Sequence, residues 1–152
     1  MSLLSPLLPT GPLNLGDRLR ELPNGTSASE LREMPGWQII PTPGHTPGHI
    51  SLYRPMDGVL LPGDAFCTTK AESFFQSSLA QSPELHGPPA YFTSDWSLAR
   101  QSVQVLAKLN PSVVAPGHGR PLSGPHVPTQ LRQLAARFEE IAVPENRRST
   151  SA

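Results

Sequence analysis

The sequence predicts an α/β fold, because short apolar runs suited to strands alternate with longer segments of helical periodicity. Proline is the second informative feature: it supplies 19 of the 152 residues, whereas a typical share is about 5%. Most prolines punctuate the apolar runs and several stand beside glycines, which indicates short elements joined by tight turns and not disorder. A chain of this length suits one domain.

Three short strands are expected in the first half of the chain. Residues 1–30 show weak periodicity and many breakers, so an extended, weakly anchored segment is predicted there. Apolar runs predict strands at 37–40, 50–53 and 59–61. The stretch 55–58 between the last two has a hairpin-turn composition, because its glycine tolerates a positive φ.

Apolar spacing predicts three helices in the second half, with a further strand at 112–115 between the second and the third. The first helix is expected over 70–81. Thr93 or Ser94 is expected to cap the second helix, and the third ends before Pro144. The apolar positions are Phe74, Phe75 and Leu79 in the first helix, Trp96, Ala99, Val103 and Leu106 in the second, and Leu131, Leu134, Phe138 and Ile141 in the third.

Composition narrows the classes of partner. Twelve basic and twelve acidic residues give a formal net charge of zero, which argues against nucleic acid and anionic membrane surfaces. The apolar start is broken by Pro6, Pro9 and Pro12, so neither a signal peptide nor a membrane span is predicted. Cys67 is the only cysteine, which excludes an internal disulfide and fits a small buried residue. A cytoplasmic location is the default expectation.

Three turns place a metal-capable side chain directly after a glycine: His45, Asp64 and His118. Each follows an expected strand, so a sheet can bring the three turns to one edge. Imidazole and carboxylate groups are good zinc ligands, and a carboxylate can join two metal ions through its two oxygens. Each residue taken alone is more often an ordinary turn residue, and the spacing does not decide between the two interpretations.

A resemblance favours the metal site. The sequence Thr-Pro-Gly-His-Thr-Pro-Gly-His at 42–49, Gly-Asp at 63–64 and Pro-Gly-His-Gly at 116–119 resemble, in this order, later metal motifs of the metallo-β-lactamase-fold hydrolases. The match is closest to the glyoxalase II-like group and covers about residues 31–143, which leaves 144–152 as a flexible tail. The resemblance implies the C-terminal half of an αββα sandwich, with a mixed sheet flanked by helices.

The resemblance also implies roles for individual residues. His45 would join a first metal site, His118 a second, and Asp64 would bridge both and act as the catalytic residue, with up to two zinc ions in the full family site. His49 is not a ligand in the family and is expected to pack or hydrogen-bond nearby. Lys70 is a candidate anchor for a substrate carboxylate or phosphate; the alternative is a solvated loop lysine.

The sequence departs from the family in one respect. The first metal motif of the family, His-x-His-x-Asp-His, does not occur among the five histidines. By family logic one site keeps only His45 and Asp64, and the other keeps only Asp64 and His118. We therefore expect the C-terminal half of such a hydrolase, as a truncated gene product, a gene with a wrongly assigned start, or one part of a split enzyme.

Two functions remain open. The first is a zinc-dependent hydrolase in which metal-bound hydroxide attacks an ester, thioester, lactone or similar bond of a small-molecule substrate, with a site that is incomplete in this chain. The second is a non-catalytic remnant or scaffold that forms a homodimer or pairs with a separate N-terminal half. In either case the sheet face with Ile50, Leu52, Val59 and Leu61 would lack its partner, which predicts marginal stability, aggregation or dimerisation.

Overall fold

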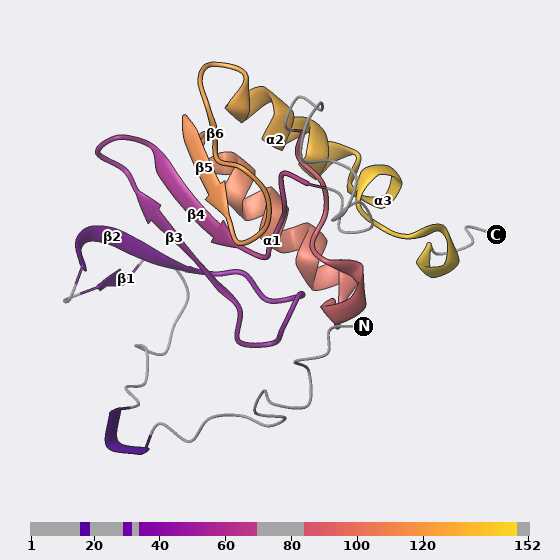
Figure 1. Cartoon of the computed structure of the whole chain (residues 1–152), viewed down its shortest axis with the longest axis horizontal. Coiled ribbons are helices and arrows are strands. Elements are labelled where there is room, and N and C mark those ends of the chain that lie inside the picture. Colours follow the sequence, from indigo (N-terminus) through magenta and orange to yellow (C-terminus); the bar gives the residue numbers. More distant parts are fainter. Residues whose placement is uncertain (1–15, 19–28, 32–33, 70–83, 149–152) are drawn as a thin grey trace, which may run out of the picture.

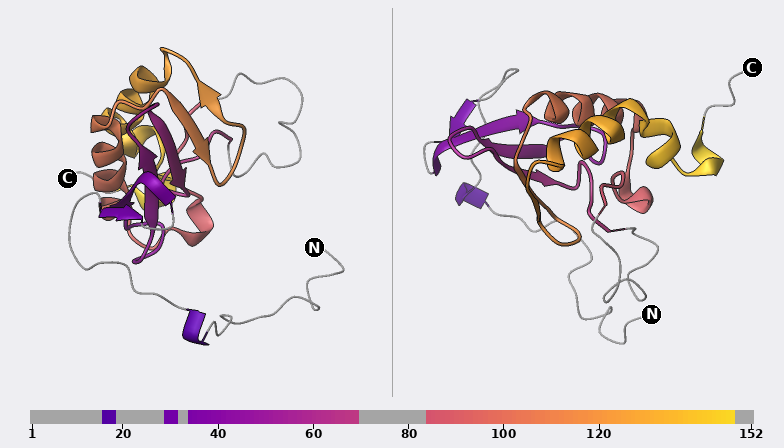
Figure 2. Two further views of the ribbon diagram at one scale, coloured as in Figure 1. Left: turned by 90° about the vertical axis from the view of Figure 1, so that its left-hand side faces the viewer. Right: turned by 90° about the horizontal axis from the view of Figure 1, so that it is seen from above.

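The computed structural model describes residues 16–18, 29–31, 34–69 and 84–148. Within these residues, strands and helices form an α/β arrangement in which α1 and α2 lie on one face of a sheet (Figures 1 and 2). The strands are β1 (Ser29–Leu31), β2 (Met34–Pro41), β3 (Ile50–Arg54), β4 (Val59–Gly63), β5 (Val113–Pro116) and β6 (Leu122–Ser123). The α-helices are α1 (Trp96–Lys108), α2 (Val127–Ala136) and α3 (Phe138–Ile141), and short 3-10 turns occur at Gly16–Arg18 (η2), Ala90–Phe92 (η4) and Glu145–Arg147 (η5).

The described strands form one six-stranded sheet, in the order β1-β2-β3-β4-β5-β6. Neighbouring strands are antiparallel except for β4 and β5, which run parallel, so the sheet is mixed as predicted. Parallel neighbours end at the same edge of a sheet. The turns that follow β4 and β5 therefore emerge side by side.

The predicted strands at 37–40, 50–53, 59–61 and 112–115 are confirmed by β2, β3, β4 and β5. The residues 55–58 form the expected turn between β3 and β4. The sequence did not predict β1 or β6, because strands of two or three residues carry too few positions to show an alternating pattern.

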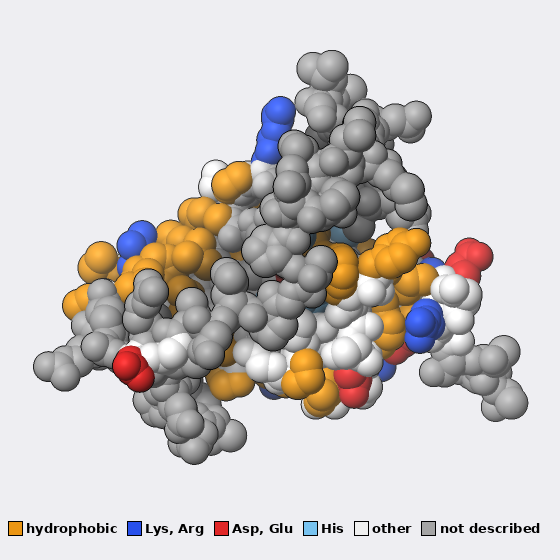
Figure 3. All heavy atoms as spheres, turned by 60° about the horizontal axis from the view of Figure 1, so that its bottom comes forward, with side chains coloured by type: hydrophobic (Ala, Val, Ile, Leu, Met, Phe, Trp, Pro, Cys, Tyr) orange, Lys and Arg blue, Asp and Glu red, His pale blue; other side chains and the backbone are white. Residues whose placement is uncertain are grey.

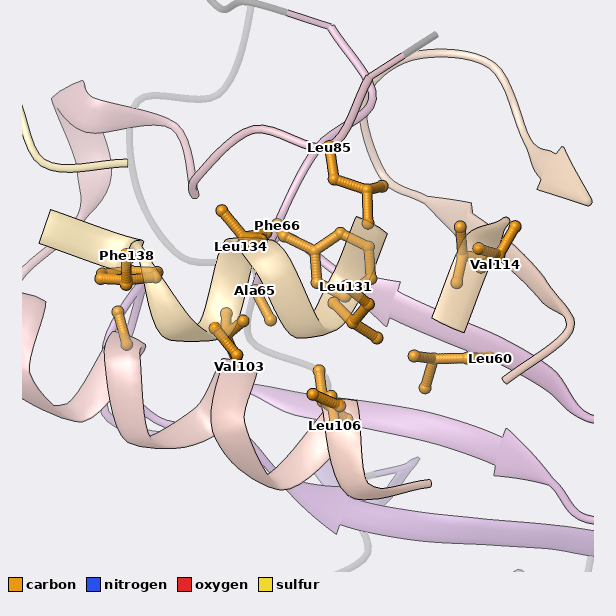
Figure 4. Close-up of a cluster of buried hydrophobic side chains, with 14 of the residues drawn as sticks. Leu60, Ala65, Phe66, Leu85, Val103, Leu106, Val114, Leu131, Leu134 and Phe138 are labelled. Atoms are coloured by element: carbon orange, nitrogen blue, oxygen red, sulfur yellow. The ribbon is translucent and has the colours of Figure 1, made fainter. Parts of the chain in front are cut away.

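The hydrophobic core lies between the sheet and the helices (Figure 4). Leu60 and Val114 point into it from neighbouring strands, Val103 and Leu106 from α1, and Leu131 from α2, and all five are fully buried. The apolar faces predicted for the second and third helices are thus confirmed as faces that pack in the core. Burying one such side chain stabilises a fold by about 1.5–3 kcal/mol.

Two details of the helices differ from the prediction. The residue that caps α1 is Asp95, not Thr93 or Ser94: the Asp95 carboxylate accepts a hydrogen bond from the backbone N–H of Leu98 at 2.9 Å. The hydroxyls of Thr93 and Ser94 instead donate hydrogen bonds to backbone carbonyls outside the helix. The expected last helix is two helices, because the backbone of Arg137 leaves the helical region between α2 and α3.

Several expectations concern residues outside the described part of the chain. They are the helix over 70–81 and most of the segment 1–30.

The first part of the expected tail is described. Its Glu145–Arg147 stretch forms a 3-10 turn, and the Arg148 guanidinium donates to the carbonyls of Val143 and Glu140. No helix in the described residues has the length and apolar character needed to cross a membrane.

The second face of the sheet is less buried than the helix-covered face. Side chains alternate between faces along a strand, so Leu61 points away from its buried neighbour Leu60. Leu61 and the other positions predicted to lack a partner, Ile50, Leu52 and Val59, are half-buried. Figure 3 shows hydrophobic side chains gathered on this side of the molecule.

Candidate metal centre

The structure brings three predicted residues together at one edge of the sheet. His45 lies in the loop 42–49 after β2, hereafter the histidine loop, whereas Asp64 follows β4 directly and His118 follows β5. The Nε2 atom of His45 is 3.6 Å from Asp64 Oδ2, and the Nε2 atom of His118 is 3.5 Å from Asp64 Oδ1. The two imidazoles thus face different oxygens of one carboxylate.

One oxygen of the Asp64 carboxylate lacks a hydrogen-bond partner among the described residues. This oxygen, Oδ1, is buried, and no described residue donates a hydrogen bond to it. A Cβ at Gly117 would come within 2.5 Å of this oxygen, so only glycine permits the turn after β5 to approach so closely. A buried, unsatisfied carboxylate oxygen is costly unless a cation completes its surroundings.

The donor set fits metal ions as two pairs. His45 with Asp64 Oδ2 makes one pair, and His118 with Asp64 Oδ1 makes the other. Neither pair is a full coordination shell: no group of three or more His, Cys, Asp or Glu side chains suited to one ion occurs among the described residues. With the roles that the family resemblance implies, each ion would have two ligands among the described residues.

The histidine loop rests on the start of α1. Gly44 has a φ of 133°, and a Cβ there would lie 2.2 Å from the backbone nitrogen of Ala99. The carbonyl of Gly44 accepts the backbone N–H of Asp95 at 2.9 Å, and the hydroxyl of Ser102 donates to the carbonyl of Pro43 at 2.7 Å. The contacts with α1 therefore fix the loop that carries His45.

The His49 imidazole bonds to the backbone of Asp64 and not to its carboxylate. Its Nε2 accepts the backbone N–H of Asp64 at 3.0 Å, and its Nδ1 lies 2.8 Å from the hydroxyl of Thr42. Burial lowers the pKa of His49 below its ordinary value. The expected packing or hydrogen-bonding role of His49 is confirmed.

One side of the centre is open to solvent. The His45 side chain is buried, but those of Asp64 and His118 keep 26% and 42% of their surface exposed. In the space-filling view, the visible histidine surface borders hydrophobic side chains (Figure 3). The ring of Phe92 meets that of His45 edge-on, with the ring centroids 6.5 Å apart, and Tyr91, the residue before Phe92, is 99% exposed.

Sequence reasoning missed the polar neighbours of the histidines. The hydroxyl of Thr93 lies 3.5 Å from His45 Nδ1, and the hydroxyl of Thr42 lies between His49 and Ser51. Threonine and serine are common in loops and strands, so their identity alone gave no signal.

Trp96 contacts Phe138, with ring centroids 6.4 Å apart, in agreement with a packing role.

The other candidates lie apart from the centre or outside the described residues. Lys70 lies outside the described residues. Cys67 is buried, as predicted, and its backbone pairs with that of His86. Burial, and to a smaller extent the charge of Asp64, raises the pKa of the Cys67 thiol to about 12. His126 is exposed at the start of α2.

Comparison with known proteins identifies related chains. Residues 17–118 match the family model described as the metallo-beta-lactamase superfamily. The chain is 44% identical over 138 residues to "Probable metallo-hydrolase YflN" of Bacillus subtilis (strain 168), and the match covers 91% of this chain and 51% of YflN. It is 38% identical over 89 residues to "Uncharacterized protein YobT" of the same organism, which covers 57% of this chain and 35% of YobT.

Solved structures share the fold. A beta-lactamase domain protein from Burkholderia ambifaria superposes with a TM-score of 0.52 at 25% sequence identity, over 83% of this chain and 35% of that one. The chain thus spans about half of YflN and about a third of the Burkholderia protein.

Proposed function

This chain belongs to the metallo-β-lactamase superfamily, and from that membership we propose that it forms part of a metal-dependent hydrolase whose zinc ligands include His45, Asp64 and His118. One observation carries the proposal: two imidazole Nε2 atoms face the two oxygens of a single carboxylate, at 3.6 and 3.5 Å. A hydrogen-bonded cluster needs a donor for each oxygen, whereas Asp64 Oδ1 has none within the part of the chain that the structure describes. A shared carboxylate between two metal ions accounts for both facts.

The residues of the chain have separate tasks in this proposal. When bound, zinc supplies Lewis acidity and lowers the pKa of its water to about 7, which yields a nucleophile at neutral pH. Asp64 holds the negative charge between the two histidines. Gly117 gives the carboxylate its close approach, and the exposed side of the centre admits a small-molecule substrate such as an ester, thioester or lactone.

Zinc titration of the purified chain by calorimetry tests this proposal, with His118→Ala as the site variant and His126→Ala as the matched control at an exposed histidine. We expect the wild-type chain and the control to bind zinc and the site variant to lose that binding. Equal binding by all three chains would place the zinc elsewhere and overturn the assignment.

A second function is favoured by a different observation: each metal ion would have only two protein ligands among the described residues. In this alternative the chain is a non-catalytic half that completes its site with a second copy or with a separate N-terminal half. Addition of the part of YflN that this chain does not match provides the test. Recovery of tight zinc binding and hydrolysis only in the mixture supports the paired form, and full activity of the single chain contradicts it.

A further inference from the structure

A chain of hydrogen bonds with a fixed direction passes through His49. The Ser51 hydroxyl donates its one hydrogen to the carbonyl of Pro62 at 3.1 Å. Ser51 must therefore accept from the Thr42 hydroxyl, 2.9 Å away, and Thr42 must in turn accept from Nδ1–H of His49 at 2.8 Å. The lone pair at Nε2 of His49 is left to accept the backbone N–H of Asp64 at 3.0 Å.

A second contact fixes the same tautomer independently. His49 Nδ1 also lies 3.1 Å from the carbonyl oxygen of Thr42, and a carbonyl can only accept. The hydrogen is therefore on Nδ1, and Nε2 is the acceptor. The two residues that supply hydroxyl groups to this series of bonds, Thr42 and Ser51, are fully buried, so water does not compete for the hydroxyl bonds.

The chain of bonds closes on the turn that carries the metal-centre carboxylate. It begins at the N–H of Asp64 and ends at the carbonyl of Pro62, two residues earlier. Gly63 between them has a φ of 57°, and a Cβ there would lie 2.7 Å from Nε2 of His49. The imidazole of His49 thus fills the space beside Gly63 and accepts the N–H of Asp64, the next residue of the turn.

We propose that His49 is a positioning residue: as the Nδ1–H tautomer, it holds the backbone of Asp64 so that the carboxylate stays between His45 and His118. The role of the carboxylate as a metal ligand rests on the proposed function. Groups that orient a ligand typically change metal affinity by about 10- to 100-fold when they are removed.

Two substitutions at position 49 separate the two ends of the imidazole. In His49→Gln the side-chain oxygen reaches the place of Nε2 and can still accept the N–H of Asp64. In His49→Asn the amide reaches the place of Nδ1 and can donate to Thr42, but nothing accepts from Asp64. His126→Asn makes the same change at an exposed histidine and serves as the control.

The first measurement uses the metal-free full chain and NMR. Nitrogen shifts of the His49 ring should show the Nδ1–H tautomer, and the Asp64 amide should exchange slowly with solvent. Exchange should become faster in His49→Asn and stay close to wild type in His49→Gln and in the control. An Nε2–H tautomer, or equal exchange in all variants, would overturn the proposal.

The second measurement is zinc affinity by calorimetry. We expect His49→Asn to bind zinc about 10- to 100-fold more weakly and His49→Gln to stay within about 3-fold of wild type. Equal losses in both variants would indicate a structural role only and contradict positioning. If the wild-type chain binds no zinc, the proposed function fails, and the tautomer and amide exchange still decide the role of His49.

A third variant keeps the test valid if His49→Asn does not fold. Ser51→Ala removes the donor to Pro62 and the acceptor for Thr42 without a change at His49. Faster exchange of the Asp64 amide in a folded Ser51→Ala chain supports the proposal. Unchanged exchange in that chain would overturn it.

Discussion

The Oδ1 atom of Asp64 is buried and has no hydrogen-bond partner among the described residues, which is unusual for a side chain that serves the fold alone. Asp64→Asn removes the charge but keeps the shape. We expect zinc affinity to fall by about 100-fold or more, because a ligand matters at least as much as the groups that orient it. The free energy of unfolding of the metal-free chain should change by less than about 1 kcal/mol, because no hydrogen bond of the carboxylate oxygen Oδ1 is lost.

Calorimetry and urea unfolding of the same protein preparation measure both effects. Asp57→Asn is a suitable control for zinc affinity, because Asp57 is an exposed carboxylate that pairs with Arg54 in the β3–β4 turn. Loss of stability without loss of zinc binding in Asp64→Asn would assign Asp64 to the fold instead of the metal centre.

Cys67 is expected to be chemically inert in the folded chain. A thiol with a pKa of about 12 holds on the order of 1,000-fold less thiolate at pH 8 than a thiol with the ordinary pKa of 9.0. Reaction with a disulfide reagent should therefore be at least about 100-fold slower in the native chain than in urea. Rapid reaction of the folded protein would show that the thiol is accessible and exclude the buried role.

At the scale of residues, the sequence indicated that His45, Asp64 and His118 can meet, because each follows a glycine after an expected strand. It did not predict the bonds of Thr42 and Ser51. Those bonds depend on the register of β2 and β3, which pairs residue 40 with residue 51. Apolar alternation predicts which face a residue occupies, but not which polar group lies opposite.

At the scale of elements, the histidine loop depends on the approach of Gly44 to α1. Gly44→Ala would place a Cβ 2.2 Å from the backbone of Ala99 and would force an L residue to a φ of 133°. We expect a loss of more than about 2 kcal/mol in the free energy of unfolding, together with weaker zinc binding, because the loop must leave the helix.

Gly48→Ala is the matched control for this prediction. Gly48 lies in the same loop, and no atom lies within 4 Å of a Cβ built there. Urea unfolding should therefore distinguish the two alanine variants clearly. Similar stability of both variants would mean that the loop does not need its contact with α1.

The elements themselves were predicted with different success. The strands β2 to β5 and the apolar face of α1 follow directly from apolar spacing. The break at Arg137 does not, because Leu134 and Phe138 keep helical spacing across it and both are buried. The spacing of apolar side chains cannot show that the backbone of one residue, Arg137, leaves the helical region when the apolar positions on both sides keep helical spacing.

At the scale of the whole molecule, the half-buried sheet face predicts self-association. Leu61→Glu would place a charge on this face, and Met56→Glu is the control, because Met56 lies in a turn and is 90% exposed. Sedimentation velocity over about a hundredfold range of protein concentration should show association of the wild-type chain and of the control, and less association of Leu61→Glu. A monomer at every wild-type concentration would contradict the prediction.

The mixed sheet was expected only through the family resemblance. Alternating apolar residues do not state whether two strands run parallel, and the pairing of β4 with β5 joins segments that are distant in the chain. The parallel pairing brings Asp64 and His118 to the same edge of the sheet, and local sequence alone does not decide that pairing.

The parallel pairing of β4 and β5 also bears on the order of folding. A hairpin such as β3–β4 closes over a few residues, whereas β5 can join β4 only after the whole crossover that includes α1 has closed. Pairings between distant segments form slowly. The contact between Asp64 and His118 should therefore appear late in refolding, so the rate at which the chain acquires zinc reports the completion of its topology.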